Sequence, residues 1–280
     1  MRLALGPRTY DVTHRAVVMG ILNRTPDSFY DGGAYFAFDE FLRRAEQLVA
    51  DGADLLDVGG VKAGPGEEVG EAEELDRVVP AVEALHARFD VPLSVDTWRA
   101  SVAAACFAAG AVVGNDISGF ADPDYLPTAA AAGASVVATH IRLAPRVPDP
   151  DPHYDDVVAT VRTHLAERAA RARAAGIPAE RIIVDAGLDL GKTPAQSLAL
   201  LRASDRLAEL GHPLLLSASN KRFLWSLLGV DRTSAGEGTM AAHALGVALG
   251  CRVLRAHDVR AARRVAHVIA AILEARHADG

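Results

Sequence analysis

The feature that most constrains the fold is an alternation of short apolar runs with longer segments of helical periodicity. Eight such runs can be identified, each followed by a segment in which apolar residues recur at helical spacing. The runs cover residues 16–22, 55–58, 92–96, 112–116, 135–140, 181–185, 213–217 and 252–257. Eight strands alternating with helices predict an α/β fold, a single (β/α)8 TIM barrel domain spanning residues 1–280.

The helical segments are predicted over residues 38–51, 71–88, 101–109, 125–132, 155–175, 194–210, 221–228, 235–250 and 260–276. Pro194 suits the first turn of its helix. The rival architecture is a doubly wound open sheet, because periodicity alone does not show that a sheet closes. The length of 280 residues suits one barrel, and half of the residues are hydrophobic, which provides a large core.

Composition excludes several classes of protein. The chain has no apolar run long enough to span a membrane and no signal-peptide core near its N-terminus, so we expect a cytoplasmic protein. Cys106 and Cys251 lie in apolar stretches and are expected to be buried and reduced. A formal net charge of −7 argues against a nucleic-acid partner, and an anionic small ligand would need a locally basic pocket.

A polar group follows every predicted strand, and the first is the most conspicuous. The stretch MGILNRTPDSFYDGG breaks from an apolar strand into a polar loop at Asn23. In a barrel, the carboxyl ends of the strands form the catalytic face. Any single polar residue there, such as Asp57 or Asp116, is equally well explained as a helix cap or turn residue. Eight polar strand ends together indicate a lined pocket.

The strand ends divide into two kinds of chemistry. Asp96, Asn115 and Asp185 can accept and donate hydrogen bonds to a flat, nitrogen-rich heterocycle. None of the strand-end residues stands out as a nucleophile. The pattern therefore predicts a site that binds and polarises its substrate.

The second kind is suited to anions. Lys221, Arg255 and His257 can bind a phosphate or diphosphate through charge-assisted hydrogen bonds. Asn23 offers a neutral oxygen, a fair ligand for Mg²⁺ that keeps its waters and touches substrate phosphates. This combination fits the departure of a diphosphate.

Several motifs in order along nearly the whole chain resemble the dihydropteroate synthase family. They are MGILNRTPDSFYDGG, GADLLDVGG, SVDT, GNDISG, LGKT and RAHDV. The resemblance implies a TIM barrel that joins 6-hydroxymethyl-7,8-dihydropterin diphosphate to 4-aminobenzoate and releases diphosphate in folate biosynthesis. It also implies a Mg²⁺ cofactor and a homodimer.

The same resemblance implies a role for individual residues. The positions matching the pterin-binding residues are Asp96, Asn115, Asp185 and Lys221, of which Asp96, Asp185 and Lys221 are the implied catalytic residues. Asn23 matches the magnesium ligand and, with Arg255 and His257, the diphosphate site. The loops for the second substrate are implied to contribute Thr25, Asp27, Phe29 and Lys62.

The sequence departs from the family mainly on the side of the second substrate. Typical members carry Gly-Gly-Glu-Ser-Thr-Arg-Pro-Gly in the second loop, where this chain has GGVKAGPG with Lys62, Ala63 and Gly64. Arg24 replaces a small apolar residue in the first loop. Further differences fall at residues 141–143, Ala186, Leu190 and Asn220.

These departures leave alternatives open. One is a catalytically impaired pterin-binding paralogue or partner subunit, and another is a transferase that uses a different amine acceptor. Lys62 is either a replacement cation for a carboxylate or a solvated loop lysine. Barrels that pass methyl groups from methyl-tetrahydrofolate to a corrinoid protein share the Asp and Asn contacts, but would not need the lysine and RAHDV anion set.

Overall fold

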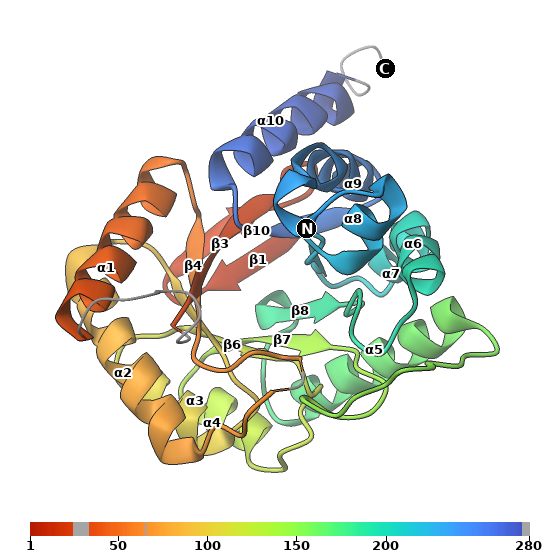
Figure 1. The fold of residues 1–280 in the computed structure, drawn as a ribbon. Helices are drawn as coiled ribbons and strands as arrows, with labels where there is room; N and C mark the ends of the chain where they lie inside the picture. The colour runs from red at the N-terminus through yellow and green to blue at the C-terminus, as the bar shows by residue number, and fades with distance from the viewer. Residues whose placement is uncertain (25–33, 65, 276–280) are drawn as a thin grey trace.

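The chain folds into a closed barrel of parallel strands, seen in a computed structural model that describes residues 1–24, 34–64 and 66–275 (Figure 1). The barrel strands are β3 (Val17–Asn23), β4 (Leu55–Gly59), β5 (Leu93–Asp96), β6 (Val113–Asp116), β7 (Ser135–Thr139), β8 (Ile182–Asp185), β9 (Leu214–Leu216) and β10 (Cys251–Ala256). They pair in chain order, and β10 closes the barrel by pairing with β3. The predicted TIM barrel is confirmed, and closure excludes the open sheet.

Helices form a ring outside the strands (Figure 1). They are α1 (Ala34–Ala50), α2 (Glu71–Arg88), α3 (Ala100–Ala108), α4 (Tyr125–Ala131), α5 (Val157–Ala174), α6 (Pro194–Arg202), α7 (Ser204–Ala208), α8 (Arg222–Leu228), α9 (Gly236–Ala248) and α10 (Val259–Ala275). The single helix predicted over residues 194–210 is wrong, because it divides at Ala203. There the Ser204 hydroxyl donates to Leu201 O at 2.8 Å, a local bond that competes with the helical ladder.

A short antiparallel hairpin, which was not predicted, covers the amino-terminal end of the barrel. Its strands are β1 (Arg2–Leu5) and β2 (Arg8–Asp11). Leu3 and Leu5 are fully buried against inward-facing barrel residues such as Val113 and Ile183. The Ser135 hydroxyl donates to Ala4 O at 2.6 Å, which ties the hairpin to β7. The opposite, carboxyl end of the barrel is thus the end left for ligands.

The strand register places the predicted site residues in one row. Asn23 pairs with Gly59, Gly59 with Asp96, and Asp96 with Asn115, so four neighbouring strands end at the same level. The apolar side chains between strands and helices form the main core, and both cysteines are free and buried there, as expected. Among the described residues, no helix is long and apolar enough to cross a bilayer.

Candidate active site

Asp57 lies at the centre of the hydrogen-bond network at the carboxyl end of the barrel. Its side chain is fully buried on β4. The carboxylate accepts hydrogen bonds from the Ser94 hydroxyl at 2.5 Å, from Asn115 Nδ2 at 3.1 Å and from Arg255 Nε at 2.7 Å. Asp57 therefore orients two of the predicted ligand-binding side chains, and its role as a helix cap is excluded by these contacts.

Arg255 joins two carboxylates. Besides Asp57, its guanidinium contacts Asp96, with 2.8 Å between Nη2 and Oδ2. Burial raises the pKa of Asp96 to about 7; Arg255 opposes this shift and Asp57 adds to it. The ion pair with Arg255 favours the carboxylate form of Asp96, which accepts hydrogen bonds from the N–H groups of a heterocycle.

Asp185 and Lys221 lie on either side of the loop that follows β8. Asp185 Oδ1 accepts from Gly187 N at 2.8 Å, and Lys221 Nζ donates to Leu188 O at 2.5 Å. Burial raises the pKa of Asp185, whereas burial lowers the pKa of Lys221 and the charge of Asp185 opposes that change. An anion and a cation are thus held close to each other at the edge of the site, each with backbone support.

His257 lies in a locally basic region of a protein whose formal net charge is −7. Its Nδ1 lies 2.9 Å from the Ser219 hydroxyl. Burial lowers the pKa of His257 to about 4, and the further lowering comes from positive charges on Arg255, Arg232, Arg44 and Lys221. Arg44 Nη2 also donates to His257 O at 2.7 Å, so positive charge surrounds this neutral imidazole and favours an anionic ligand.

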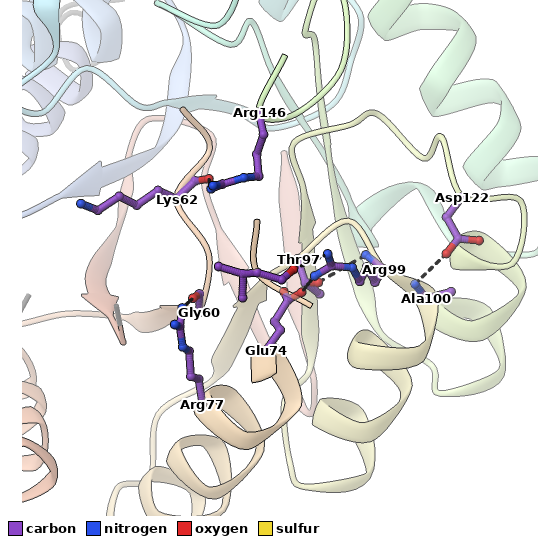
Figure 2. Close-up of polar contacts among 10 residues, drawn as sticks. Gly60, Lys62, Glu74, Arg77, Thr97, Arg99, Ala100, Asp122 and Arg146 are labelled. Carbon is purple, nitrogen blue, oxygen red and sulfur yellow. Dashed lines mark hydrogen bonds and ion pairs between the residues drawn. The ribbon is translucent and has the colours of Figure 1, made fainter. Parts of the chain in front are cut away.

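The altered second loop is held by arginines (Figure 2). Arg77 Nη1 donates to Gly60 O at 2.8 Å, Arg146 Nη1 to Lys62 O at 3.0 Å, and Arg99 Nη2 to Val69 O at 2.8 Å. The three guanidiniums come from α2, from the loop after β7 and from the loop after β5. Arg99 itself is anchored by an ion pair with Glu74, which is fully buried. The loop is therefore fixed from three sides.

The predicted second-substrate residues are only partly described. Lys62 is exposed, and its side chain extends away from Arg146 in Figure 2. Thr25, Asp27 and Phe29 lie outside the residues that the structure describes.

The side chain of Arg24 packs onto α1, while its backbone N donates to Gly59 O at 2.7 Å, at the start of the second loop. Its guanidinium carbon lies 4.8 Å from the ring centre of Phe38 and 5.8 Å from that of Phe41. Burial lowers the pKa of Arg24, and the nearby Arg77 adds to the lowering. The Arg24 guanidinium thus contacts the aromatic rings of Phe38 and Phe41 on α1.

Several supporting residues were not singled out from the sequence. Ser94 and Ser219 orient Asp57 and His257, and Lys192 is buried beneath the β8 loop. A serine within a strand carries no distinguishing pattern, whereas Lys192 lies in the LGKT motif, which indicated the family and not a role for the lysine. Asp116, in contrast, acts as a turn residue, one of the two roles considered from the sequence. Its carboxylate accepts hydrogen bonds from Ser118 N at 2.6 Å and Phe120 N at 2.9 Å.

Comparison with known proteins identifies relatives of this site. A family model described as "Pterin binding enzyme" matches residues 19–257. The dihydropteroate synthase of Bacillus subtilis is 38% identical over 95% of this chain and 92% of its own length. A protein named "Inactive dihydropteroate synthase 2" of Mycobacterium tuberculosis is 45% identical over 92% of this chain and 83% of its own length.

Solved structures that are similar to this chain are also dihydropteroate synthases. Dihydropteroate synthase of Yersinia pestis in complex with a sulfonamide drug superposes with a TM-score of 0.91 at 38% identity, over 98% of this chain and all of that one. The enzyme of Xanthomonas albilineans with 4-aminobenzoic acid gives a TM-score of 0.90 at 40% identity, over 97% of this chain and 98% of the other. The fold, the polar residues at the ends of the strands and the relatives lead to one conclusion: the chain belongs to the dihydropteroate synthase family of pterin-binding enzymes.

Proposed function

We propose that this protein is a dihydropteroate synthase-type transferase acting on 6-hydroxymethyl-7,8-dihydropterin diphosphate and 4-aminobenzoate. The observation that carries the proposal is the juxtaposition of a heterocycle site with a basic pocket at one end of the barrel. Asp96, Asn115 and Asp185 supply the first, and Arg255 and His257 belong to the second. The named ligands of the Xanthomonas structures, 4-aminobenzoic acid and 7,8-dihydropteroate, support the same assignment.

In the proposed reaction, the carbon–oxygen bond of the exocyclic methylene breaks and diphosphate leaves with the bonding electrons. The amine nitrogen of 4-aminobenzoate then bonds to that carbon and loses a proton. Asp96 and Asp185 hold the pterin ring, and their negative charge stabilises the positive charge that develops at the methylene. Arg255 and His257 receive the departing diphosphate.

Magnesium is part of the proposal, with Asn23 as the protein ligand at the end of β3. Within the described residues, no group of three acidic, histidine or cysteine side chains is placed to hold a metal ion. An exposed neutral amide at the end of β3, next to Gly59, fits an ion that keeps most of its waters and takes oxygens from the diphosphate. When bound, Mg²⁺ would neutralise charge on the leaving group.

A second candidate function is a catalytically impaired paralogue that binds pterin, alone or as a partner subunit. Two observations favour it: the Lys62-Ala63-Gly64 segment, and the 45% identity to mycobacterial proteins named inactive. Asp96, Asn115 and Asp185 lie on other strands than this segment, so pterin binding is expected to survive the loss of turnover. A transferase with another amine acceptor is the third possibility that the altered loop supports.

Diphosphate release separates these functions. Purified protein with Mg²⁺ and the dihydropterin diphosphate is assayed with and without 4-aminobenzoate, and with a panel of substituted anilines. Release that depends on 4-aminobenzoate supports the synthase, whereas release with another aniline alone supports a changed acceptor. Calorimetric pterin binding without any release supports the impaired paralogue. Lys62→Ala is expected to alter only second-substrate behaviour, and Asp185→Ala to abolish pterin binding.

We also propose that the protein is a cytoplasmic homodimer. Helix α9 packs between α8 and α10, and these helices expose large apolar side chains. They include Leu227 (64% exposed), Val268 (59%) and Ile272 (50%). Exposed apolar residues on α8 and α10, the two neighbours of α9, support a subunit interface. The two free, buried cysteines support a reducing compartment. Light scattering coupled to gel filtration tests the dimer, and a monomeric mass would refute it.

A further inference from the structure

Lys192, in the LGKT motif, is buried in a way that is unusual for a lysine. Its side chain is 2% exposed, and its ammonium lies among four acceptors. These are Gly187 O at 2.8 Å, Leu190 O at 3.0 Å, His140 Nδ1 at 3.0 Å and His140 O at 3.2 Å. Burial lowers the pKa of Lys192 to about 7, and the charge of Asp185 opposes this shift. In its ammonium form the group has three protons, and all of them are used. Burial lowers the pKa of His140 to about 3, so its ring is neutral and can accept.

The acceptors belong to two elements, and Lys192 joins them. His140 follows β7, whereas Gly187 and Leu190 are in the loop between β8 and α6. This loop contains three left-handed residues within five positions, Gly187, Asp189 and Gly191, with φ values of 65°, 64° and 62°. A β-carbon on Gly187 would lie 1.9 Å from His140 O, so the two elements are in close contact. The Lys192 ammonium donates hydrogen bonds to the carbonyl groups that this backbone directs into the protein interior.

The loop held by Lys192 supports both charged pterin residues. Gly187 N donates to Asp185, and Leu188 O, the next residue, accepts from Lys221 at 2.5 Å. His140 adds a third link, because its backbone N donates to Asp185 O at 3.0 Å. Lys192 itself is too deeply buried to touch a ligand, so it acts on the site through this loop.

We propose that Lys192 is a positioning residue whose ammonium fixes the β8–α6 loop and thereby sets the geometry of Asp185 and Lys221 for the pterin ring. The ligand identity rests on the proposed function, but the positioning of the two side chains does not. Loss of the ammonium leaves two loop carbonyls, the His140 carbonyl and the His140 ring nitrogen without this donor, so the loop rearranges to satisfy them.

The test compares Lys192→Met, which keeps the length of the side chain and removes its donors, with the wild type. Affinity for 6-hydroxymethyl-7,8-dihydropterin is measured by calorimetry at a temperature where both proteins are folded. We expect it to fall about tenfold or more in the variant. Affinity for inorganic diphosphate is expected to fall less than affinity for the pterin, because Lys221 is one of several cations around His257 whereas Asp185 belongs to the heterocycle site. Leu85→Ala, a cavity-forming change in α2, serves as the destabilised control with unchanged affinity for both ligands.

A spectroscopic readout keeps the test independent of ligand identity. The chain contains three lysines, Lys62, Lys192 and Lys221, so protein labelled with ¹³C at lysine Cε gives three resolvable signals. We expect Lys192→Met to shift the Lys221 signal and Leu85→Ala to leave it unchanged. Absence of pterin binding in the wild type refutes the proposed function alone. An unmoved Lys221 signal in folded Lys192→Met overturns the positioning role, as does unchanged pterin affinity.

Discussion

At the scale of single residues, Asp57 organises the site although its sequence context suggested an equal chance of a helix cap. It is paired with Arg255, which is 198 positions away in the sequence. Spacing along the chain cannot reveal such a pair, because it depends on which strands become neighbours of β3. The residues that would touch ligand were predictable from strand ends, whereas the residues that orient them were not.

The Asp57–Arg255 pair makes a quantitative prediction. Asp57→Ala removes one of the two carboxylates of Arg255 and leaves the Asn115 amide and the Ser94 hydroxyl without their acceptor, while Asp96 still pairs with Arg255. We expect the free energy of unfolding to fall by about 1–3 kcal/mol. Chemical denaturation measures the loss. The double variant Asp57→Leu with Arg255→Met is expected to lose less unfolding free energy than the sum of the losses in Asp57→Leu and Arg255→Met measured singly. Additive losses would contradict the coupling between the two side chains.

His243 on α9 makes a prediction about acid stability. It is fully buried, neither ring nitrogen has a hydrogen-bond partner in the part of the chain described, and burial lowers its pKa to about 4. The unfolded state takes up the proton near pH 6.5, so stability is complete above that pH and is lost as the pH falls towards 4. At pH 5 this loss amounts to about 2 kcal/mol.

Replacing the ring should remove that loss. The gain in unfolding free energy of His243→Leu over the wild type is expected to be about 2 kcal/mol larger at pH 5 than at pH 8. Urea denaturation at the two pH values measures it, and exposed His153→Leu is the matched control. The same gain at both pH values would show that His243 does not titrate as proposed.

At the scale of elements, the alternation of apolar and helical segments was sufficient to predict the eight barrel strands. At this scale the β1–β2 hairpin was missed, and residues 194–210 were predicted as one helix. Four-residue strands are too short to show a period, and the break at Ala203 depends on a single serine hydroxyl. The arginine contacts that hold the second loop depend on packing between elements and have no local sequence signal.

The second loop can be tested at this scale through its single lysine. Arg146 donates through its side chain to Lys62 O and through its backbone N to Ala63 O at 3.0 Å. Arg146→Ala is expected to speed tryptic cleavage after Lys62 about fivefold or more, because the loss of side-chain bonds frees the peptide bond for the protease. Mass spectrometry of timed digests measures the rate. Arg8→Ala, a surface change on β2, is the control. Equal rates of cleavage after Lys62 in both variants would show that Arg146 does not hold the second loop.

At the scale of the whole molecule, the barrel separates stability from function at its two ends. The hairpin fills the amino-terminal end, and the ligand-facing residues occupy the other. Leu5→Ala is expected to lower the free energy of unfolding by about 2–5 kcal/mol, since Leu5 is fully buried. Pterin affinity measured on the folded variant should remain within about twofold of the wild type. A large loss of affinity would show that the two ends are coupled.

The most direct test of the central claim is the release of diphosphate from 6-hydroxymethyl-7,8-dihydropterin diphosphate in the presence of Mg²⁺. The account predicts release that depends on 4-aminobenzoate and that is lost in Asp185→Ala, a change confined to the heterocycle site. Folded wild-type protein that binds the pterin and releases no diphosphate with 4-aminobenzoate would contradict the synthase assignment.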